Sequence, residues 1–143
     1  MIREDFSYPK EEMDKLIVTD GTYQAAIWTD NAGPSICYDY YTEPMKKMRE
    51  DEEERLDYKC ARIRIPKVDY STIVEAIVNT EYSNDQMQAL VSNYLIAQDP
   101  VVEISDEKKK EYSEKWVTLQ EYRLKAKAIA ALVTINTEDA ANV

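Results

Sequence analysis

The stretch YQAAIWTDNAGPSICYDYY, residues 23–41, decides the fold. Apolar and polar side chains alternate in residues 23–28 and again in residues 35–41, which is the period of strands with one buried face. The polar segment 29–34 between them is typical of a turn. The sequence therefore predicts an antiparallel hairpin. One face of this hairpin is formed by Tyr23, Ala25, Ile27, Ile36, Tyr38 and Tyr40.

The turn of this hairpin contains Asn31 and Gly33, two residue types suited to positive φ. Residues 30–33 also have a faint likeness to a calcium-binding loop. Such a loop needs oxygen ligands at alternating positions, and the spacing here does not supply them. A plain turn is the favoured interpretation.

A third strand is expected over residues 56–65, where apolar and polar residues again alternate, and Pro66 ends it. Three antiparallel strands with one apolar face make a sheet too small to be stable alone, so it needs a helical cover. One face of the third strand carries Ala61, Ile63 and Ile65, and the other carries Cys60, Arg62 and Arg64.

Residues 69–135 have helical periodicity and supply that cover. Asp69 or Ser71 is suited to begin the first helix, Ser83 with Gln86 forms a capping box for the second, and Ser105 precedes the third. Buried stripes are expected at Tyr70, Ile73, Val74, Ile77 and Val78, then at Met87, Leu90, Val91, Tyr94 and Leu95, and last at Tyr112, Trp116, Leu119, Tyr122, Ala126, Ile129 and Val133.

We therefore expect an α+β fold, in which a small N-terminal three-stranded antiparallel sheet packs against a C-terminal bundle of two to three helices. Residues 1–143 form a single domain at this length. It comprises a β-rich half (residues 1–68), a helical half (residues 69–135) and a polar tail (residues 136–143).

The composition excludes most of the common kinds of catalytic site. The chain has no histidine, so it lacks an imidazole base, a Ser-His or Cys-His pair and a histidine ligand for zinc. It has only two glycines, so a phosphate-cradling loop is absent. A carboxylate-only enzyme was also considered, but no apolar segment isolates one acid from the others. We predict no catalytic, cofactor-binding or metal-binding residues and a protein that is not an enzyme.

The charge also limits the partners. There are 28 acidic and 18 basic residues, a net charge of −10, which repels nucleic acid and anionic membranes. The N-terminus has no apolar signal-peptide core, and no stretch is long and apolar enough to span a membrane. The protein is expected in the cytoplasm when synthesised, with Cys37 and Cys60 as two small buried thiols. The acidic run at residues 50–54 is expected to be a solvated hairpin loop, with a cation site or a docking surface as the alternatives.

Aromatic residues are the candidates for binding. The chain has eleven tyrosines and two tryptophans, and exposed residues of these types anchor protein interfaces. We expect Trp28 and Tyr41 to lie on the outer face of the sheet, away from the helices. Phe6 and Tyr8 in the N-terminal segment are further interface candidates.

Arg62 and Arg64 are expected on the same outer face, opposite Asp39. Cross-strand ion pairing is the ordinary role of such residues. Contact with an acidic partner is the alternative.

The helical half contains the motifs YSxDxMxxL from Tyr82 and LQEYRxxAK from Leu119, within residues 70–130. With these motifs it resembles the helical hairpin found in small proteins of phage and prophage structural-gene clusters. It implies a short β region joined to the hairpin, and a virion structural or accessory protein that contacts other virion subunits or copies of itself. After synthesis, the protein would then be located in the virion.

A different class of function was weighed against this one. A charge of −10 also suits a small acidic inhibitor that imitates DNA and blocks a host nucleic-acid enzyme. Such a mimic needs carboxylates at phosphate-like spacing along one face. Here the acids are dispersed and interleaved with lysines.

Overall fold

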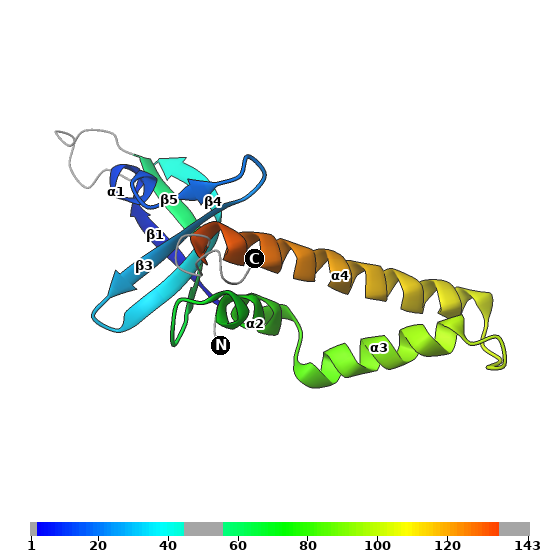
Figure 1. Ribbon diagram of the computed structural model, residues 1–143. Helices are drawn as coiled ribbons and strands as arrows, with labels where there is room; N and C mark the ends of the chain where they lie inside the picture. The colour runs from blue at the N-terminus through cyan, green and yellow to red at the C-terminus, as the bar shows by residue number, and fades with distance from the viewer. Residues whose placement is uncertain (1–2, 45–55, 135–143) are drawn as a thin grey trace.

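The computed structural model describes residues 3–44 and 56–134, and the fold is α+β (Figure 1). The sheet is antiparallel with the strand order β1-β5-β4-β3-β2. Its strands are β1 (Arg3–Pro9), β2 (Val18–Thr19), β3 (Gln24–Asp30), β4 (Gly33–Pro44) and β5 (Leu56–Arg64). The helices are α1 (Lys10–Asp14), α2 (Tyr70–Glu81), α3 (Asn84–Gln98) and α4 (Asp106–Thr134).

The sheet has five strands where the sequence predicts three. The β3–β4 hairpin and β5 are confirmed, but β1 and β2 were missed. In β1 the polar residues Arg3, Asp5 and Ser7 pair across from Ile63, Ala61 and Lys59 of β5. These polar residues therefore lie on the helix-covered side, at the edge of the sheet. The apolar residues that would mark a buried strand face are absent from this side of β1, so alternation did not reveal the strand. β2 has only two residues, too few for a pattern.

The inner face of the sheet, the one that the helices cover, carries the main core. The expected apolar residues of β3, β4 and β5 pair in register there, with Ala25 opposite Tyr38 and Ile36 opposite Ile63. α2 and the C-terminal half of α4 lie over this face (Figure 1). The buried cluster contains Ala25, Ile36, Tyr38, Ala61, Ile63, Ile65, Ile73, Ala76, Ile77, Val78, Ala126, Ile129 and Ala130.

The predicted helix starts are confirmed by hydrogen bonds. The Asp69 carboxylate accepts from the Thr72 backbone amide at 2.8 Å at the start of α2. Ser83 and Gln86 form the reciprocal capping box of α3. The Ser105 hydroxyl accepts from the Lys108 amide at 3.2 Å before α4. Each side chain satisfies an amide that the first helical turn leaves unpaired.

A β-bulge in β4 changes the face assignment that alternation predicts. Asp39 has a φ of 57°, and the register with β5 shifts between Tyr38 and Tyr41. The extra residue reverses the alternation beyond it. Tyr40 therefore lies on the outer face, where its hydroxyl is 3.6 Å from the Met13 sulfur. The prediction that Tyr40 shares a face with Tyr38 is wrong. Tyr41 falls opposite Lys59, on the inner-face row.

Helix α1 covers one end of the outer face of the sheet. Met13 is fully buried although the helix has only five residues. The Tyr58 hydroxyl of β5 donates to Asp14 at 2.8 Å, and the Tyr40 and Tyr58 rings meet edge to face. The outer face is thus partly covered by its own chain. The predictions for residues 50–54 and 136–143 lie outside the described residues.

Candidate protein-interaction surfaces

Phe6, Tyr8 and Trp28 form an aromatic cluster on the outer face. The rings of Tyr8 and Trp28 lie 4.0 Å apart, and those of Phe6 and Trp28 lie 5.7 Å apart, between centroids. β1 and β3 are separated by β5 and β4, so a flat sheet would place them roughly 14 Å apart. The sheet therefore curls around its outer face, and the three half-buried rings lie inside the curve.

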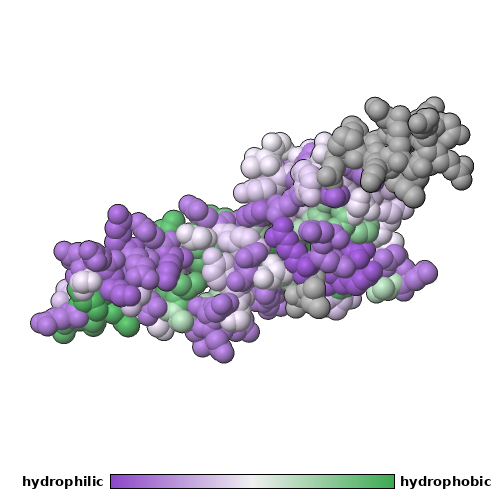
Figure 2. Space-filling view, turned by 180° about the vertical axis from the view of Figure 1, so that it is seen from behind, coloured by the Kyte–Doolittle hydropathy of each residue, from purple (hydrophilic) through white to green (hydrophobic). Residues whose placement is uncertain are grey.

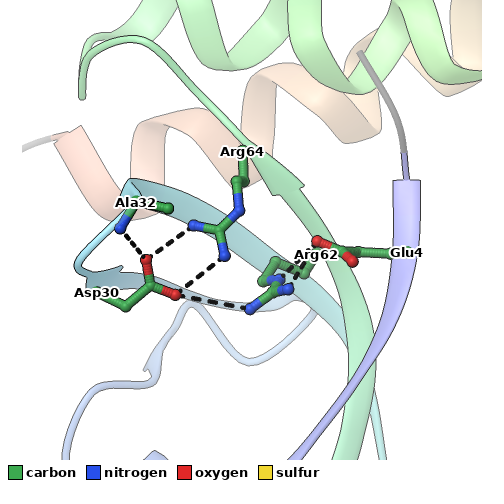
Figure 3. Close-up of polar contacts among 5 residues, drawn as sticks. All are labelled: Glu4, Asp30, Ala32, Arg62 and Arg64. Carbon is green, nitrogen blue, oxygen red and sulfur yellow. Dashed lines mark hydrogen bonds and ion pairs between the residues drawn. The ribbon is translucent and has the colours of Figure 1, made fainter.

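Arg62 of β5 contacts both this cluster and Glu4 of β1, and Figure 3 shows the contact with Glu4. Its guanidinium carbon lies 4.3 Å from the Phe6 ring centroid, a cation–π arrangement. Two of its nitrogens donate to the same Glu4 oxygen, at 3.0 and 2.7 Å. The guanidinium is mostly buried, so the ring and the carboxylate fix its position.

Arg64 makes a bidentate contact with Asp30, at 2.8 and 3.0 Å (Figure 3). The Ala32 amide also donates to this carboxylate, and the turn is the plain one that was favoured. These bonds, with that from Arg64 foremost, lower the pKa of Asp30 to about 2. Gly33 has the predicted positive φ, whereas Asn31 does not. In the described part of the chain, Asp39 is the one non-glycine residue with a positive φ.

The predicted role of these arginines is confirmed, but the predicted partner is wrong. Arg62 and Arg64 pair across strands with Glu4 and Asp30, and Asp39 has other partners. The bulge turns Asp39 toward the helices, where it binds Lys125 at 2.8 Å and Arg3 at 3.4 Å.

The structure thus brings together five of the six candidate interface residues on one face of the sheet: Phe6, Tyr8, Trp28, Arg62 and Arg64. Tyr41 is the exception. It is 57% exposed, but the bulge places it on the opposite face from Trp28.

The two cysteines are neighbours on the outer face, and Cys37 lies beside Tyr40, whose hydroxyl meets Met13 of α1. Both are buried, and their thiols are within hydrogen-bonding reach of each other. This contact and burial raise the pKa of the Cys37 thiol. Because a thiol reacts as its thiolate, the raised pKa and the burial make Cys37 unreactive in the folded protein.

The α3–α4 hairpin is a second candidate surface, which the sequence did not single out. It projects from the sheet, and of the elements that the structure describes α4 is the one that packs along α3 (Figure 1). α3 contains no buried residue, which contradicts the predicted burial of Val91 and Leu95; Leu95 is 61% exposed. At the free end of the hairpin Val101 is 84% exposed.

α3 is also nearly free of charge. Asp85 is its one charged residue of fifteen, in a chain of which 32% is charged. A helix whose outer side faces only water normally carries charges on that side, whereas interface cores are depleted of them. This depletion was visible in the sequence and could have identified α3 as a contact surface. Figure 2 shows hydrophobic side chains gathered toward the free end of the hairpin.

Open grooves run beside α4. One of about 470 Å³ lies between the start of α3 and α4, lined by Tyr82, Leu90, Thr118 and the Glu111–Lys115 ion pair. Residues 3–44 and 56–134 hold no cluster of three or more potential metal ligands. Within the same residues, no helix combines the length and apolar character needed to cross a membrane.

No family model, curated protein or solved structure matches this chain. Its function must therefore be inferred from the two surfaces.

Proposed function

We propose that this protein is a non-enzymatic structural or accessory component of a phage particle that acts through protein–protein contacts. The observation that carries the proposal is α3, a helix without a buried residue and with one charge. Leu95 and Val101 remain exposed near the end of the hairpin that points away from the sheet. The assignment to a phage particle rests on the resemblance of the Tyr82 and Leu119 motifs to the hairpins of phage structural-gene clusters.

The geometry suits a subunit that reaches into an assembly. α4 has 29 residues and is about 43 Å long, and its C-terminal half is anchored on the sheet. The Tyr94 and Trp116 rings stack at 4.7 Å and hold α3 against the projecting half. The curled sheet is the base, and α3 presents a nearly uncharged surface away from it.

An acidic DNA mimic has less support. A mimic must leave its carboxylates free to replace phosphates, yet Asp30, Asp39 and Glu111 are each bound by two cations. Glu4 is bound by Arg62. These acids are therefore neutralised within the chain.

The test is co-purification with particles. Particles from cells that carry the tagged gene in its native phage or prophage would be banded in a density gradient, and the protein would be detected in the fractions. We expect it in the particle band, and expect Leu95→Glu with Val101→Glu to remove it. Leu16→Glu is the matched control, because Leu16 is 40% exposed on the sheet side of the molecule. A protein confined to the soluble fractions contradicts the proposal.

A further inference from the structure

We infer that one side of the α3–α4 hairpin is a homodimer interface, on which a second copy of this chain completes an antiparallel four-helix bundle. The inference rests on the proposed function and names one partner for the hairpin. It comes from the spacing of exposed residues on the two helices.

Each helix carries two adjacent stripes at heptad spacing. The inner stripe holds the hairpin together, with residues such as Leu90 and Tyr94 on α3 and Trp116 and Leu119 on α4. The outer stripe is made of the residues that directly follow the inner ones. It consists of Asn84, Gln88, Val91, Leu95 and Gln98 on α3 and of Ser113, Val117, Gln120, Leu124, Lys127 and Ala131 on α4.

The two halves of the outer stripe lie on the same side of the hairpin. Advancing by one residue along a helix turns the side-chain direction by 100° about the helix axis, in the same sense relative to the chain direction on both helices. Because α3 and α4 run antiparallel, that rotation carries both halves to one side. Two stripes about 100° apart are what a helix needs to contact two neighbours in a four-helix bundle, and here one neighbour is missing.

The outer stripe is apolar at its centre. Val91, Leu95, Val117 and Leu124 are between 38% and 65% exposed. Its one charged member is Lys127, so two copies can approach on this side despite the net charge of −10 on each. Elsewhere on the described surface, charged residues are frequent and two identical chains would repel each other.

The level of the residues fixes the symmetry. The Tyr94–Trp116 stack places Val91 level with residue 119 of α4, beside Gln120. Val91 is also the middle residue of α3. A two-fold axis through this level sets α3 antiparallel to α3 of the second copy, with Val91 against its equivalent, and keeps the two sheets at opposite ends.

Gln120 supports this symmetry. Its side-chain nitrogen is buried and has no hydrogen-bond partner in residues 3–44 and 56–134. An unpaired buried amide is unfavourable. The two-fold axis places the Gln120 amides of both copies at the same level, where each amide can donate to the other once it turns outward from its buried position. It also places Lys127 at the level of Asp99 of the second copy, on the diagonally opposite helix, so opposite charges share one end of the bundle.

The face is large enough for a dimer of ordinary size. α3 is about 22 Å long, and two packed helices are about 20 Å wide. Two such faces give roughly 900 Å² as flat area, and the accessible surface of interdigitated side chains is larger. The expected burial is near the lower limit of stable interfaces, about 1,200 Å².

Sedimentation velocity on the full chain, from about 5 to 500 µM, tests the inference. We expect a concentration-dependent dimer, with a dissociation constant at least ten-fold higher in Val91→Glu and in Leu124→Glu. Ile96→Glu is the matched control: Ile96 lies on α3 with the same exposure as Val91, 37% against 38%, but outside the outer stripe. Circular dichroism verifies that each variant is folded.

A second measurement reports the symmetry directly. Val91→Cys should form a cross-linked dimer under mild oxidation, and Ile96→Cys should not, since the two native cysteines are buried. A monomer at every concentration, a dimer that survives Val91→Glu, or equal cross-linking of the two cysteine variants overturns the inference. A monomer that still bands with particles would leave the proposed function standing.

Discussion

Met13 offers the sharpest test of how the outer face is protected. Its side chain is fully buried although α1 has only five residues, and it contacts Tyr40, which lies beside Cys37. Truncation of a buried methionine to alanine costs about 2–5 kcal/mol. We take about 3 kcal/mol for Met13→Ala, because a short surface segment can partly relax into the space left.

Most of this loss should appear as opening of α1 and not as unfolding of the whole domain. The two thiols, which this segment protects through the Met13–Tyr40 contact, would then react with a disulfide reagent more often. Since 1.4 kcal/mol corresponds to a factor of ten, about 3 kcal/mol predicts a labelling rate on the order of a hundred-fold higher. The assay is thiol labelling of the native protein without denaturant, beside a urea titration of global stability.

Two variants act as controls for Met13→Ala. Leu16→Ala removes an exposed apolar side chain from the same connection and should change labelling little. Ile73→Ala empties the core on the other face of the sheet, so it lowers global stability without uncovering the thiols. Equal labelling of the Met13→Ala and Ile73→Ala proteins would refute the view that α1 is the local cover.

Three further outcomes are expected. Ser83→Ala removes the capping box of α3 and should lower the free energy of unfolding by about 1 kcal/mol in urea titrations; an unchanged value would contradict the cap. Asp30 has a folded pKa of about 2, below its ordinary value of 3.8, so its contribution to stability is present above pH 3.8 and is lost as the pH falls toward 2. Asp30→Asn should therefore flatten the decrease of the urea midpoint in that window, and a decrease as steep as in the wild type would disprove the Arg64 contact as its cause. Trp116→Ala removes a half-buried ring stacked on Tyr94 and should cost roughly 2 kcal/mol. Hydrogen exchange should then show faster exchange in α3 while the sheet stays protected, and uniform loss of protection would argue against a separately opening hairpin.

The β3–β4 hairpin and β5 could be predicted because their alternation follows the burial of one face. The bulge could not, because it depends on one residue, Asp39, adopting a left-handed conformation that its ion pairs with Arg3 and Lys125 help to hold. That single residue moves Tyr40 to the outer face and Tyr41 away from it. One extra residue in a strand is therefore enough to reverse a prediction made from alternation.

The burial of α3 was overestimated for a related reason. Helical spacing places Met87, Leu90, Val91, Tyr94 and Leu95 on a broad apolar surface, but it does not say how many neighbours cover that surface. Among the described helices and strands, α4 is the main neighbour of α3, and it covers the stripe that contains Tyr94. Val91 and Leu95 form the next stripe and remain exposed. Periodicity within one chain cannot show whether a second chain covers this stripe.

The two surfaces differ in what a partner must displace. On the outer face of the sheet, Arg62 and Arg64 are already bound to Glu4 and Asp30, so a partner that covers them removes ion pairs from water and gains no new charge contact. On α3, a partner covers valine, leucine and amide side chains, whose removal from water is favourable or can be offset by hydrogen bonds. The hairpin should therefore contribute more binding free energy than the aromatic cluster. If alanine substitutions at Trp28 weakened association more than those at Leu95, this order would be wrong.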